Sequence, residues 1–422
     1  MNPFTWFFKA RDKPNKVTDA VSSAIEFSFG SSAAGKTANP EQAMQLSAVY
    51  ACVRVLAETV ASLPIHVYEV TESGAQRVYD HPLYHVLHDE PNSEMTSFIW
   101  RETIMAHLNL WGNSYSQIIR DGAGNVLELW PLLPDYMDVD RANNGDLVYT
   151  YTNSKGEETV LRADQVLHIP ALGFDGIMGY SPIALEKNAV GLAIAAEDYG
   201  SKFFQNGATP SGILFHPNTV KNPAKIREAW NKAYGGASNG SKVAVLEEDM
   251  RYQQLTIPNN AAQFLETRKF QVSEICRIFR VPPHLIGDME HATFSNIEHQ
   301  SIDFAVHTIR PWLVRIEQAI NRTLFTENDK GRFYVQFNID GLMRGDYKSR
   351  MEGYAIARQN GWMSANDIRA LENMNPIPPE QGGDDYLCNG NMIPITAAGK
   401  VQVEQTENDQ PGKEETDEND QV

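Results

Sequence analysis

One segment near the N-terminus matches a nucleotide-binding pattern letter for letter. Gly30, Gly35, Lys36 and Thr37 fit G-x-x-x-x-G-K-T, in which backbone amides cradle phosphates and the lysine contacts the terminal ones. That mechanism requires a strand before the loop and a helix directly after it. Pro40 breaks such a helix within one turn, and no β-α-β unit surrounds the segment. We interpret the match as a coincidence in a Ser/Ala/Gly-rich stretch.

The other residues with chemical potential do not form a recognisable catalytic or metal site. Four histidines recur late in the chain, at His284, His291, His299 and His307. They have neither the H-E-x-x-H spacing nor the paired Cys/His clusters of a zinc site. The letters G-x-S-x-G at residues 236–240 fall in a Gly-Ser turn rather than in a strand-to-helix elbow, and no dinucleotide-binding G-x-G-x-x-G occurs. The sequence therefore predicts a protein that is not an enzyme and has no cofactor or metal.

Length and charge restrict the class of function. The 422 residues have room for two or three modules, and no apolar run approaches the roughly 20 residues that span a bilayer. The formal net charge is −18, of which about −11 remains when the acidic stretch from Glu404 onward is left out. A tight DNA binder neutralises phosphates with basic side chains. We therefore expect a surface along which DNA could slide without sticking.

Cysteine usage is typical of a reduced compartment. Cys52, Cys276 and Cys388 are odd in number and widely spaced, and two of them lie in apolar helical runs. We expect buried, reduced thiols and assembly of the protein in a cytoplasm.

The elements around residues 262–325 are the central pattern of the chain. The run Ala262–Val281 carries apolar residues at helical spacing, and the Pro-Pro pair at 282–283 ends it. Ser295 with Glu298 forms a capping box that predicts the start of a second helix. That helix carries one apolar seam as far as Leu324, and Pro311 within it predicts a kink.

Further helices and strands surround this helix-loop-helix. A helix is expected from Pro40 to Leu63, and another from Ser181 to the Asn-Gly pair at 206–207, on the order of 39 Å long. Alanines keep the second one slim, which would allow close packing against copies of itself. Residues 209–257 predict a compact αβ insertion. A strand at 332–340 and two C-terminal helices, the second capped by Ser364, complete the folded part.

Two runs, FLETRKFQVSEICRIFRVPPHLIGDMEHATFSNIEHQSIDF and SAVYACVRVLAETVASLPIHVYE, resemble the portal proteins of tailed bacteriophages. HPLYHVLHDEPN and GNSYSQIIRD fit the same family, and the resemblance covers roughly residues 40–379. It implies an α+β portal fold with wing, stem, clip, tunnel loop and crown. The implied segments are an N-terminal flexible arm (1–39), wing (40–180), stem helix (181–208), clip (209–257), second stem helix (258–281), tunnel loop (282–296), long kinked helix and wing strand (297–345), crown (346–378) and disordered acidic tail (379–422).

The resemblance also implies function and partners. It implies a homo-oligomeric, dodecameric ring at one capsid vertex of the virion, through which double-stranded DNA is packaged and ejected. Partners would be the large terminase subunit, a head-completion or adaptor protein, and the major capsid or scaffolding protein, with no membrane. The implied DNA-facing loop residues are His284, Leu285, Ile286, Asp288, Met289, Glu290, His291 and Phe294. The implied stem and oligomer-interface residues are Ala189, Ala193, Ala196, Arg268, Lys269 and Arg277.

Two alternatives remain open at this point. A P-loop NTPase would require the match at residues 30–37 to bind nucleotide. A structural adaptor that does not close into a ring would share the acidity and the helices.

Overall fold

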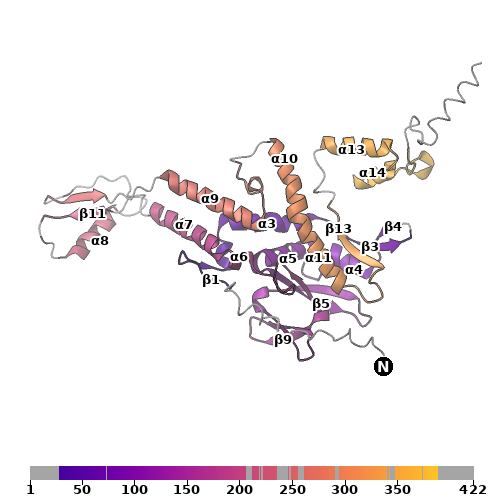
Figure 1. Ribbon diagram of the computed structural model, residues 1–422, viewed down its shortest axis with the longest axis horizontal. Helices are drawn as coiled ribbons and strands as arrows, with labels where there is room; N and C mark the ends of the chain where they lie inside the picture. The colour runs from indigo at the N-terminus through magenta and orange to yellow at the C-terminus, as the bar shows by residue number, and fades with distance from the viewer. Residues whose placement is uncertain are drawn as a thin grey trace, which may run out of the picture. The chain divides into compact units, whose positions relative to one another are not determined.

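The computed structural model describes residues 28–387 except 73, 206–211, 218, 220–221, 235–245, 247–248, 255–260, 290–293, 340–341, 343–346 and 373. The chain divides into two units, Met1–Met343 and Arg344–Val422. The predicted tail beyond residue 387 and the first 27 residues of the predicted arm lie outside the described residues. The architecture mixes helices with antiparallel sheets, which confirms the α+β prediction (Figure 1).

The helices of the first unit are α2 (Pro40–Ala43), α3 (Ser47–Ser62), α4 (Pro82–His88), α5 (Ser97–Trp111), α6 (Pro182–Leu185), α7 (Lys187–Gln205), α8 (Pro223–Tyr234), α9 (Ala261–Phe279), α10 (Phe294–Asp303) and α11 (Arg310–Thr323). A π-helical segment, Phe304–Ile309, joins α10 to α11. The strands are β1 (Gly30–Ser31), β2 (Thr37–Ala38), β3 (Ile65–Thr71), β4 (Gly74–Val78), β5 (Asn113–Arg120), β6 (Val126–Leu132), β7 (Met137–Arg141), β8 (Leu147–Thr152), β9 (Glu158–Arg162), β10 (Val166–Pro170), β11 (Gly212–Phe215), β12 (Arg251–Gln254) and β13 (Phe333–Phe337).

Three three-stranded sheets have the orders β13-β3-β4, β10-β5-β6 and β7-β8-β9, and all their pairs are antiparallel. The late strand β13 pairs with the early strand β3, placing Val335 opposite Val67. This pairing joins residues more than 260 positions apart and fixes the segment after α11 to the first half of the chain.

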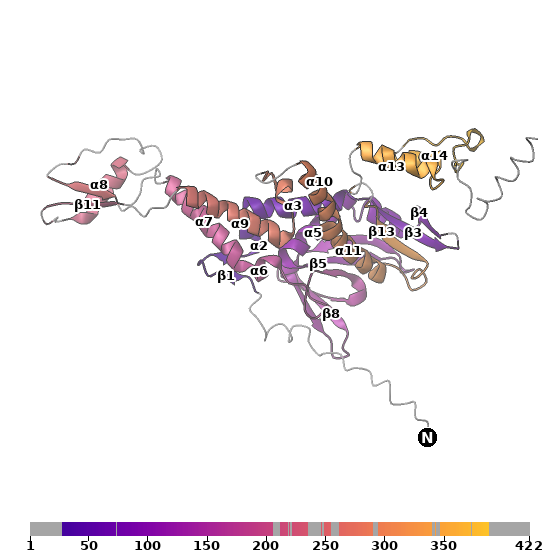
Figure 2. The same ribbon diagram turned by 45° about the horizontal axis from the view of Figure 1, so that its top comes forward.

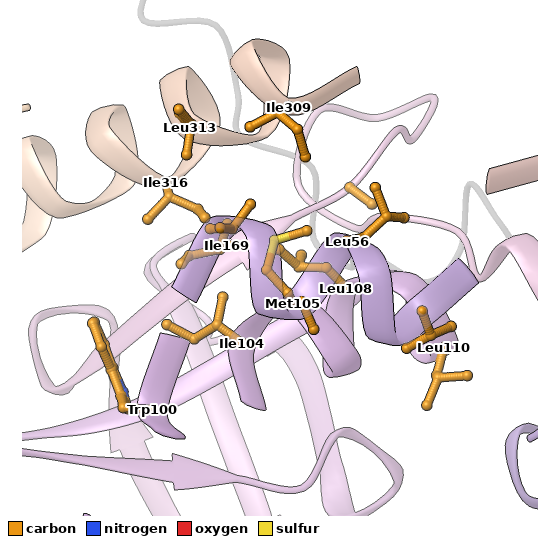
Figure 3. Close-up of a cluster of buried hydrophobic side chains, with 14 of the residues drawn as sticks. Leu56, Trp100, Ile104, Met105, Leu108, Leu110, Ile169, Ile309, Leu313 and Ile316 are labelled. Atoms are coloured by element: carbon orange, nitrogen blue, oxygen red, sulfur yellow. The ribbon is translucent and has the colours of Figure 1, made fainter. Parts of the chain in front are cut away.

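The main core lies where α3 and α5 meet β10 and α11. Trp100, Ile104 and Leu108 recur along one face of α5 at steps of four and are fully buried. Figure 3 shows them with Ile169 of β10 and with side chains of α11 and the π-helical segment that precedes it. Truncating one such side chain to alanine would typically destabilise the fold by about 2–5 kcal/mol. This core holds the later helices in place.

Two outer strand edges are closed by side chains. Asn321 of α11 accepts a hydrogen bond from the Val335 amide (2.7 Å) and donates one to the Val335 carbonyl (3.2 Å). Glu317 accepts from the Phe337 amide at 2.8 Å. On β6, the Leu129 amide donates to the Pro91 carbonyl, and Asn92 donates to the Leu129 carbonyl. The outward-facing backbone groups of Val335 and Leu129 and the amide of Phe337 are therefore satisfied within the chain.

Two predicted helices are interrupted. The Pro40–Leu63 prediction was wrong as one helix, because α2 ends at Ala43 and α3 begins at Ser47. Likewise the helix expected from Ser181 to residue 206 breaks at Glu186, whose ψ of 31° is not helical. The break lets α6 pack against α5 while α7 packs against α9. The α7 helix has 19 residues and is about 28 Å long, shorter than expected.

The second unit contains α13 (Tyr347–Gln359) and α14 (Ala365–Leu371). The predicted cap is confirmed, since Ser364 and Asp367 form a reciprocal capping box. Tyr354 of α13 donates a hydrogen bond to Glu372 at 2.9 Å, which joins the two helices. Among the described residues of the whole chain, no helix is long and apolar enough to cross a membrane.

Candidate site at the stem helices and the following loop

The segment that matches the phosphate-binding pattern is a hairpin. Strands β1 and β2 pair antiparallel, with Ser31 opposite Thr37, whereas a phosphate loop joins a strand to a helix. Lys36 forms an ion pair with Asp198 of α7, so its ammonium is engaged by a carboxylate. The described part of the predicted arm, residues 28–39, therefore packs as a structured element. This geometry does not support the NTPase alternative.

The hairpin lies against α7 at Gly191. A Cβ at Gly191 would come within 2.3 Å of the Ser32 Cβ, so a larger residue would push the hairpin away. The Ala33 amide also donates to Asn188 at 2.9 Å. These contacts fix the start of the described chain to the first long helix of the site.

Helices α7 and α9 lie side by side in both views (Figures 1 and 2). Ala193 is only 5 % exposed and belongs to the core. Ala193 and Ala196 line a small cavity bounded by α3 and α9, while Ala189 is half-buried. The small size of Ala193 therefore has a reason within its own chain. Its prediction as an oligomer-interface residue remains untested.

The exposed apolar residues of the two helices are elsewhere. Leu192, Ala195 and Tyr199 follow one face of α7 at steps of three and four, and Leu192 and Tyr199 are exposed. On α9, Phe270 and Arg277 are exposed and are also seven residues apart. Seven-residue spacing of this kind marks one side of a helix. The spacing of Leu192 and Tyr199 is visible in the sequence, but the prediction named the alanines of α7 instead.

The predicted basic residues of the site lie on α9. Arg268 reaches Glu197 of α7 across the helix pair at 3.4 Å, and Arg277 pairs with Glu274 on its own helix. Lys269 is exposed and has an interaction partner. Exposed pairs of this kind contribute about 0–1 kcal/mol each. The Arg268–Glu197 pair therefore orients α7 and α9 only weakly, and side-chain packing between the helices supplies most of the stability.

The end of α9 is a Schellman motif in which a non-glycine residue takes the left-handed position. Arg280 has a φ of 56°, the Val281 amide donates to the Cys276 carbonyl, and the Arg280 amide donates to the Arg277 carbonyl. Val281 and Cys276 are buried. The hydroxyl of Thr308, from the π-helical segment, donates to the Arg280 carbonyl at 2.8 Å. The point where the loop leaves α9 is therefore held by the next helical arm.

The first part of the predicted tunnel loop is packed against the body. Residues Pro283–Ile286 form a 3₁₀ turn, and Leu285 and Ile286 are partly buried against the core beside α3. His284 is hydrogen-bonded to Gln300 of α10 at 2.8 Å. Asp288 is half-buried, whereas Met289 is 56 % exposed. Glu290 and His291 lie outside the described residues, as does the side chain of Phe294.

The helix after the loop differs in detail from the prediction. It begins at Phe294, one residue before the predicted cap Ser295, and the side chains of Ser295 and Glu298 that would form the capping box lie outside the described residues. The π-helical segment Phe304–Ile309 stands directly before Pro311, which occupies the first turn of α11. Proline lacks an amide donor and disturbs the ladder of the preceding turn. A π segment at that point agrees with the irregularity expected from Pro311.

The site therefore consists of two packed helices and a loop with a fixed base. Among the described residues, no three His, Cys, Asp or Glu side chains are grouped so that they could hold a metal ion.

Comparisons with known proteins identify the family of this chain. The family model "Phage portal protein" matches residues 47–373. The chain is 38 % identical to "Probable portal protein" of Streptomyces phage phiC31, over 83 % of this chain and 79 % of that protein. It is 34 % identical to "Portal protein" of Enterobacteria phage HK97, over 86 % and 85 %.

Solved structures with a similar fold come from gene transfer agent (GTA) particles. A chain of the "Virion of native gene transfer agent (GTA) particle" has a TM-score of 0.56 at 22 % identity, covering 80 % of this chain and 94 % of that one. A chain of the "Neck of native GTA particle computed with C12 symmetry" has a TM-score of 0.53 at 20 % identity, with coverages of 82 % and 97 %.

The chain belongs to the phage portal protein family. Its function is that of the family, the passage at a capsid vertex through which double-stranded DNA enters and leaves. The portal prediction is thereby confirmed, and the P-loop alternative is not favoured.

Proposed function

We propose that twelve copies of this chain close into a ring whose stem is built by α7 and α9 and whose narrowest part is built by residues 288–296. In this proposal, residues 40–180 with β13 form the wing and residues 346–378 the crown. Residues 209–257 form the clip, which docks the large terminase subunit and later a head-completion or adaptor protein. The capsid or scaffolding protein contacts the ring from outside, and assembly takes place in the host cytoplasm.

The observation that carries the proposal is the loop between α9 and α10. Its base is fixed by the Schellman motif, by the Thr308 hydrogen bond and by the packing of Leu285 and Ile286. Met289 carries the first exposed side chain of the loop. A loop with a rigid base can hold a short tip at a constant distance from a channel axis. This narrows the predicted DNA-facing set from residues 282–296 to its second half.

The charge of the loop favours sliding over gripping. Residues 281–296 contain Asp288 and Glu290 but no lysine or arginine. Since DNA affinity comes mainly from neutralising phosphates, this loop would restrain the duplex sterically. The net charge of −18 for the whole chain supports the same behaviour.

Support for a ring comes from the exposed stripes of the stem. Leu192 and Tyr199 on α7, and Phe270 with Arg277 on α9, lie on faces that the packing of α7 against α9 leaves exposed. A closed ring requires two different faces on each subunit that fit one another. We assign the α7 face of one copy to the α9 face of the next. The C12 symmetry of the similar neck supports twelve copies.

The proposed clip is a small lobe with its own packing. Strands β11 and β12 pair antiparallel, with Ile213 opposite Gln253, and Trp230 of α8 stacks on Tyr252 with ring centroids 5.5 Å apart. A small αβ lobe inserted between the two long helices of the stem is suited to carry docking contacts for other proteins.

The experiment that tests the DNA-facing role replaces residues 288–293 by a Gly-Ser linker and leaves 282–287 unchanged. The packed base should then stay intact, so rings and proheads should form normally. Particles should fail to retain full-length DNA, which pulsed-field gels of extracted genomes would show. A matched control replaces only Met289 by Leu, which keeps the size and apolar character of the tip. Filled heads of normal DNA content from the linker variant would refute the role of this loop.

The two alternatives are separated by simpler measurements. Lys36→Ala should leave nucleotide binding absent and packaging unchanged, and removal of the half-buried Lys36–Asp198 pair should change stability by about 1 kcal/mol. A packaging defect in this variant at normal ring yield would revive the NTPase alternative. Monomeric mass of the wild-type chain at high protein concentration would favour the adaptor that does not close.

A further inference from the structure

The loop at residues 171–180, between β10 and α6, exposes two large apolar side chains. Leu172 is 73 % exposed and Phe174 is 75 % exposed, more than the other large hydrophobic residues of the described first unit. The function proposed above does not use either residue. Scattered exposed apolar residues are normal on protein surfaces, so exposure alone does not indicate a binding site.

The backbone of this loop is held in place at both ends. The Tyr180 amide donates to the Leu172 carbonyl at 2.9 Å and closes the loop on itself. The buried side chain of Asn113 accepts from the Gly179 amide at 2.8 Å and donates to the Gly179 carbonyl at 2.7 Å. Arg315 of α11 donates to the carbonyls of Pro170 and Ala171, at 2.7 and 3.0 Å.

The interior of the loop is equally constrained. Asp175 Oδ1 accepts hydrogen bonds from the amides of Ile177 and Met178, both at 2.8 Å. At Gly179, an added Cβ would lie 2.0 Å from the Gly112 carbonyl oxygen, so the two backbones touch. The ring of Phe174 packs edge-on against Tyr180, with centroids 5.0 Å apart.

The rigidity of the loop determines where its two exposed side chains lie. A mobile loop could fold Leu172 and Phe174 onto its own surface, but a loop anchored by two neighbouring elements keeps them in water. A preformed apolar projection loses little conformational freedom when a partner covers it. Aromatic side chains held this way are typical anchors of protein interfaces.

The position in the chain indicates which partner covers the loop. Two residues after Tyr180, Pro182 begins α6, and α7 follows with the exposed stripe that we assign to the ring interface. Leu185, the last residue of α6, is also exposed. Exposed apolar residues thus continue from the 171–180 loop into the proposed interface. In a ring of identical copies, one projection per subunit meets one acceptor on the next subunit at every junction.

We propose that the 171–180 loop inserts Leu172 and Phe174 into the neighbouring copy of this chain and is a second contact of the ring, outside the stem. This inference rests on the ring proposed above. The loop is also joined to α11 through Arg315, so the contact is anchored on the helical arm of α10, the π-helical segment and α11 that follows the DNA-facing loop.

The test begins with the wild-type chain, whose ring must be seen by mass photometry before the variants are interpreted. Phe174→Ser combined with Leu172→Ser should shift the population from rings to monomers at least tenfold at matched concentration. Both side chains are about three-quarters exposed, so the unfolding midpoint of the monomer should not change. Leu127→Ser, which removes another exposed leucine from β6, is the control and should form rings normally.

A photo-crosslinker locates the acceptor directly. With p-benzoylphenylalanine in place of Phe174, irradiation of assembled rings should give crosslinked dimers of this chain, and mass spectrometry would identify the acceptor peptide. Absence of a ring in the wild type would overturn the proposed function. Normal rings from the double serine variant, or crosslinks only to capsid or head-completion proteins in proheads, would overturn this inference and leave the ring intact.

Discussion

At the scale of single residues, Arg101 is an unusual feature of the core. Its guanidinium is buried, donates to the carbonyl of Leu63 at the end of α3, and also donates to the Ser97 carbonyl at 3.1 Å. Burial lowers the pKa of Arg101 to about 10. No carboxylate among the described residues pairs with it, so the carbonyls at the end of α3 supply its negative partner.

Replacing Arg101 by methionine removes the donor and leaves the buried Leu63 carbonyl unsatisfied. We expect a loss of about 1–3 kcal/mol in the free energy of unfolding, partly offset because a buried charge is also removed. Arg101→Lys should lose less, because an ammonium can still donate. Urea unfolding of the three proteins would measure this order. Equal stability of the wild type and the methionine variant would show that the hydrogen bond contributes nothing.

Two buried histidines predict acid sensitivity. Burial lowers the pKa of His66 and of His107 to about 4 each, and in both rings Nδ1 has no partner among the described residues. The unfolded chain binds these protons near pH 6.5 and the folded chain does not. The contribution of these two histidines to stability should therefore be fully present above pH 6.5. As the pH falls from 6.5 to about 4, the free energy of unfolding should decrease by about 1.4 kcal/mol per pH unit for each histidine.

His107→Phe should remove the share of the slope that comes from His107, about 1.4 kcal/mol per pH unit between pH 6.5 and 4. Unfolding free energies measured at several pH values in that window give the slope. An unchanged slope in the variant would mean that His107 is protonated in the folded protein.

At the scale of elements, the two faces of α7 predict different defects. Leu192→Ser with Tyr199→Ser should reduce ring formation and leave the folded monomer intact, because both side chains are exposed. Ala193→Leu should instead destabilise the chain itself by about 1–3 kcal/mol, since the site is packed against α3 and α9. Light scattering gives the mass and thermal unfolding gives the stability. If Ala193→Leu altered only the mass, the assignment of the two faces would be reversed.

Some of these elements could be predicted from the sequence because their signals are local. The Pro-Pro pair at 282–283 ended α9, and Ser364 with Asp367 capped α14 as expected. The break at Glu186 has no local signal, because it arises from α6 packing on α5. The hairpin at residues 30–38 depends on its contact with α7 at Gly191. The hydrogen bond of Thr308 has no local signal either, since its acceptor, the Arg280 carbonyl, lies 28 residues away.

At the scale of the whole molecule, the acidic balance predicts how DNA movement responds to added charge. Met289→Lys with Glu290→Lys would place two cations at the proposed constriction, multiplied by the number of subunits. Translocation should slow, most strongly at low salt, where attraction to phosphates is least screened. Met289→Gln with Glu290→Gln, which adds no cation, is the control. Packaging rates measured in a defined motor assay at low and high salt would show this slowing of translocation. A slowing that does not depend on salt would indicate a steric cause.

The α+β class and the family could be predicted from the sequence, because several motifs occur in order along most of the chain. Which face of α7 packs within its own chain could not be predicted, because slimness of a helix does not show which neighbour it faces. Ala193 faces its own chain, whereas Leu192, one residue earlier, is exposed. A single step along a helix rotates a side chain by about 100°, so the assignment needs the packed structure.

The closed edges of β13 and β6 decide what kinds of polymer this chain can form. A bare strand edge is a template on which further copies add without limit, giving fibres or amorphous precipitate. Asn321, Glu317 and Asn92 occupy those two positions before any copy meets another. Strand addition at these two positions is hindered, so contacts between copies there are left to helix and loop surfaces, whose geometry can return to its starting point. The side chains at these two sheet edges thereby favour assemblies of finite size over open-ended polymers.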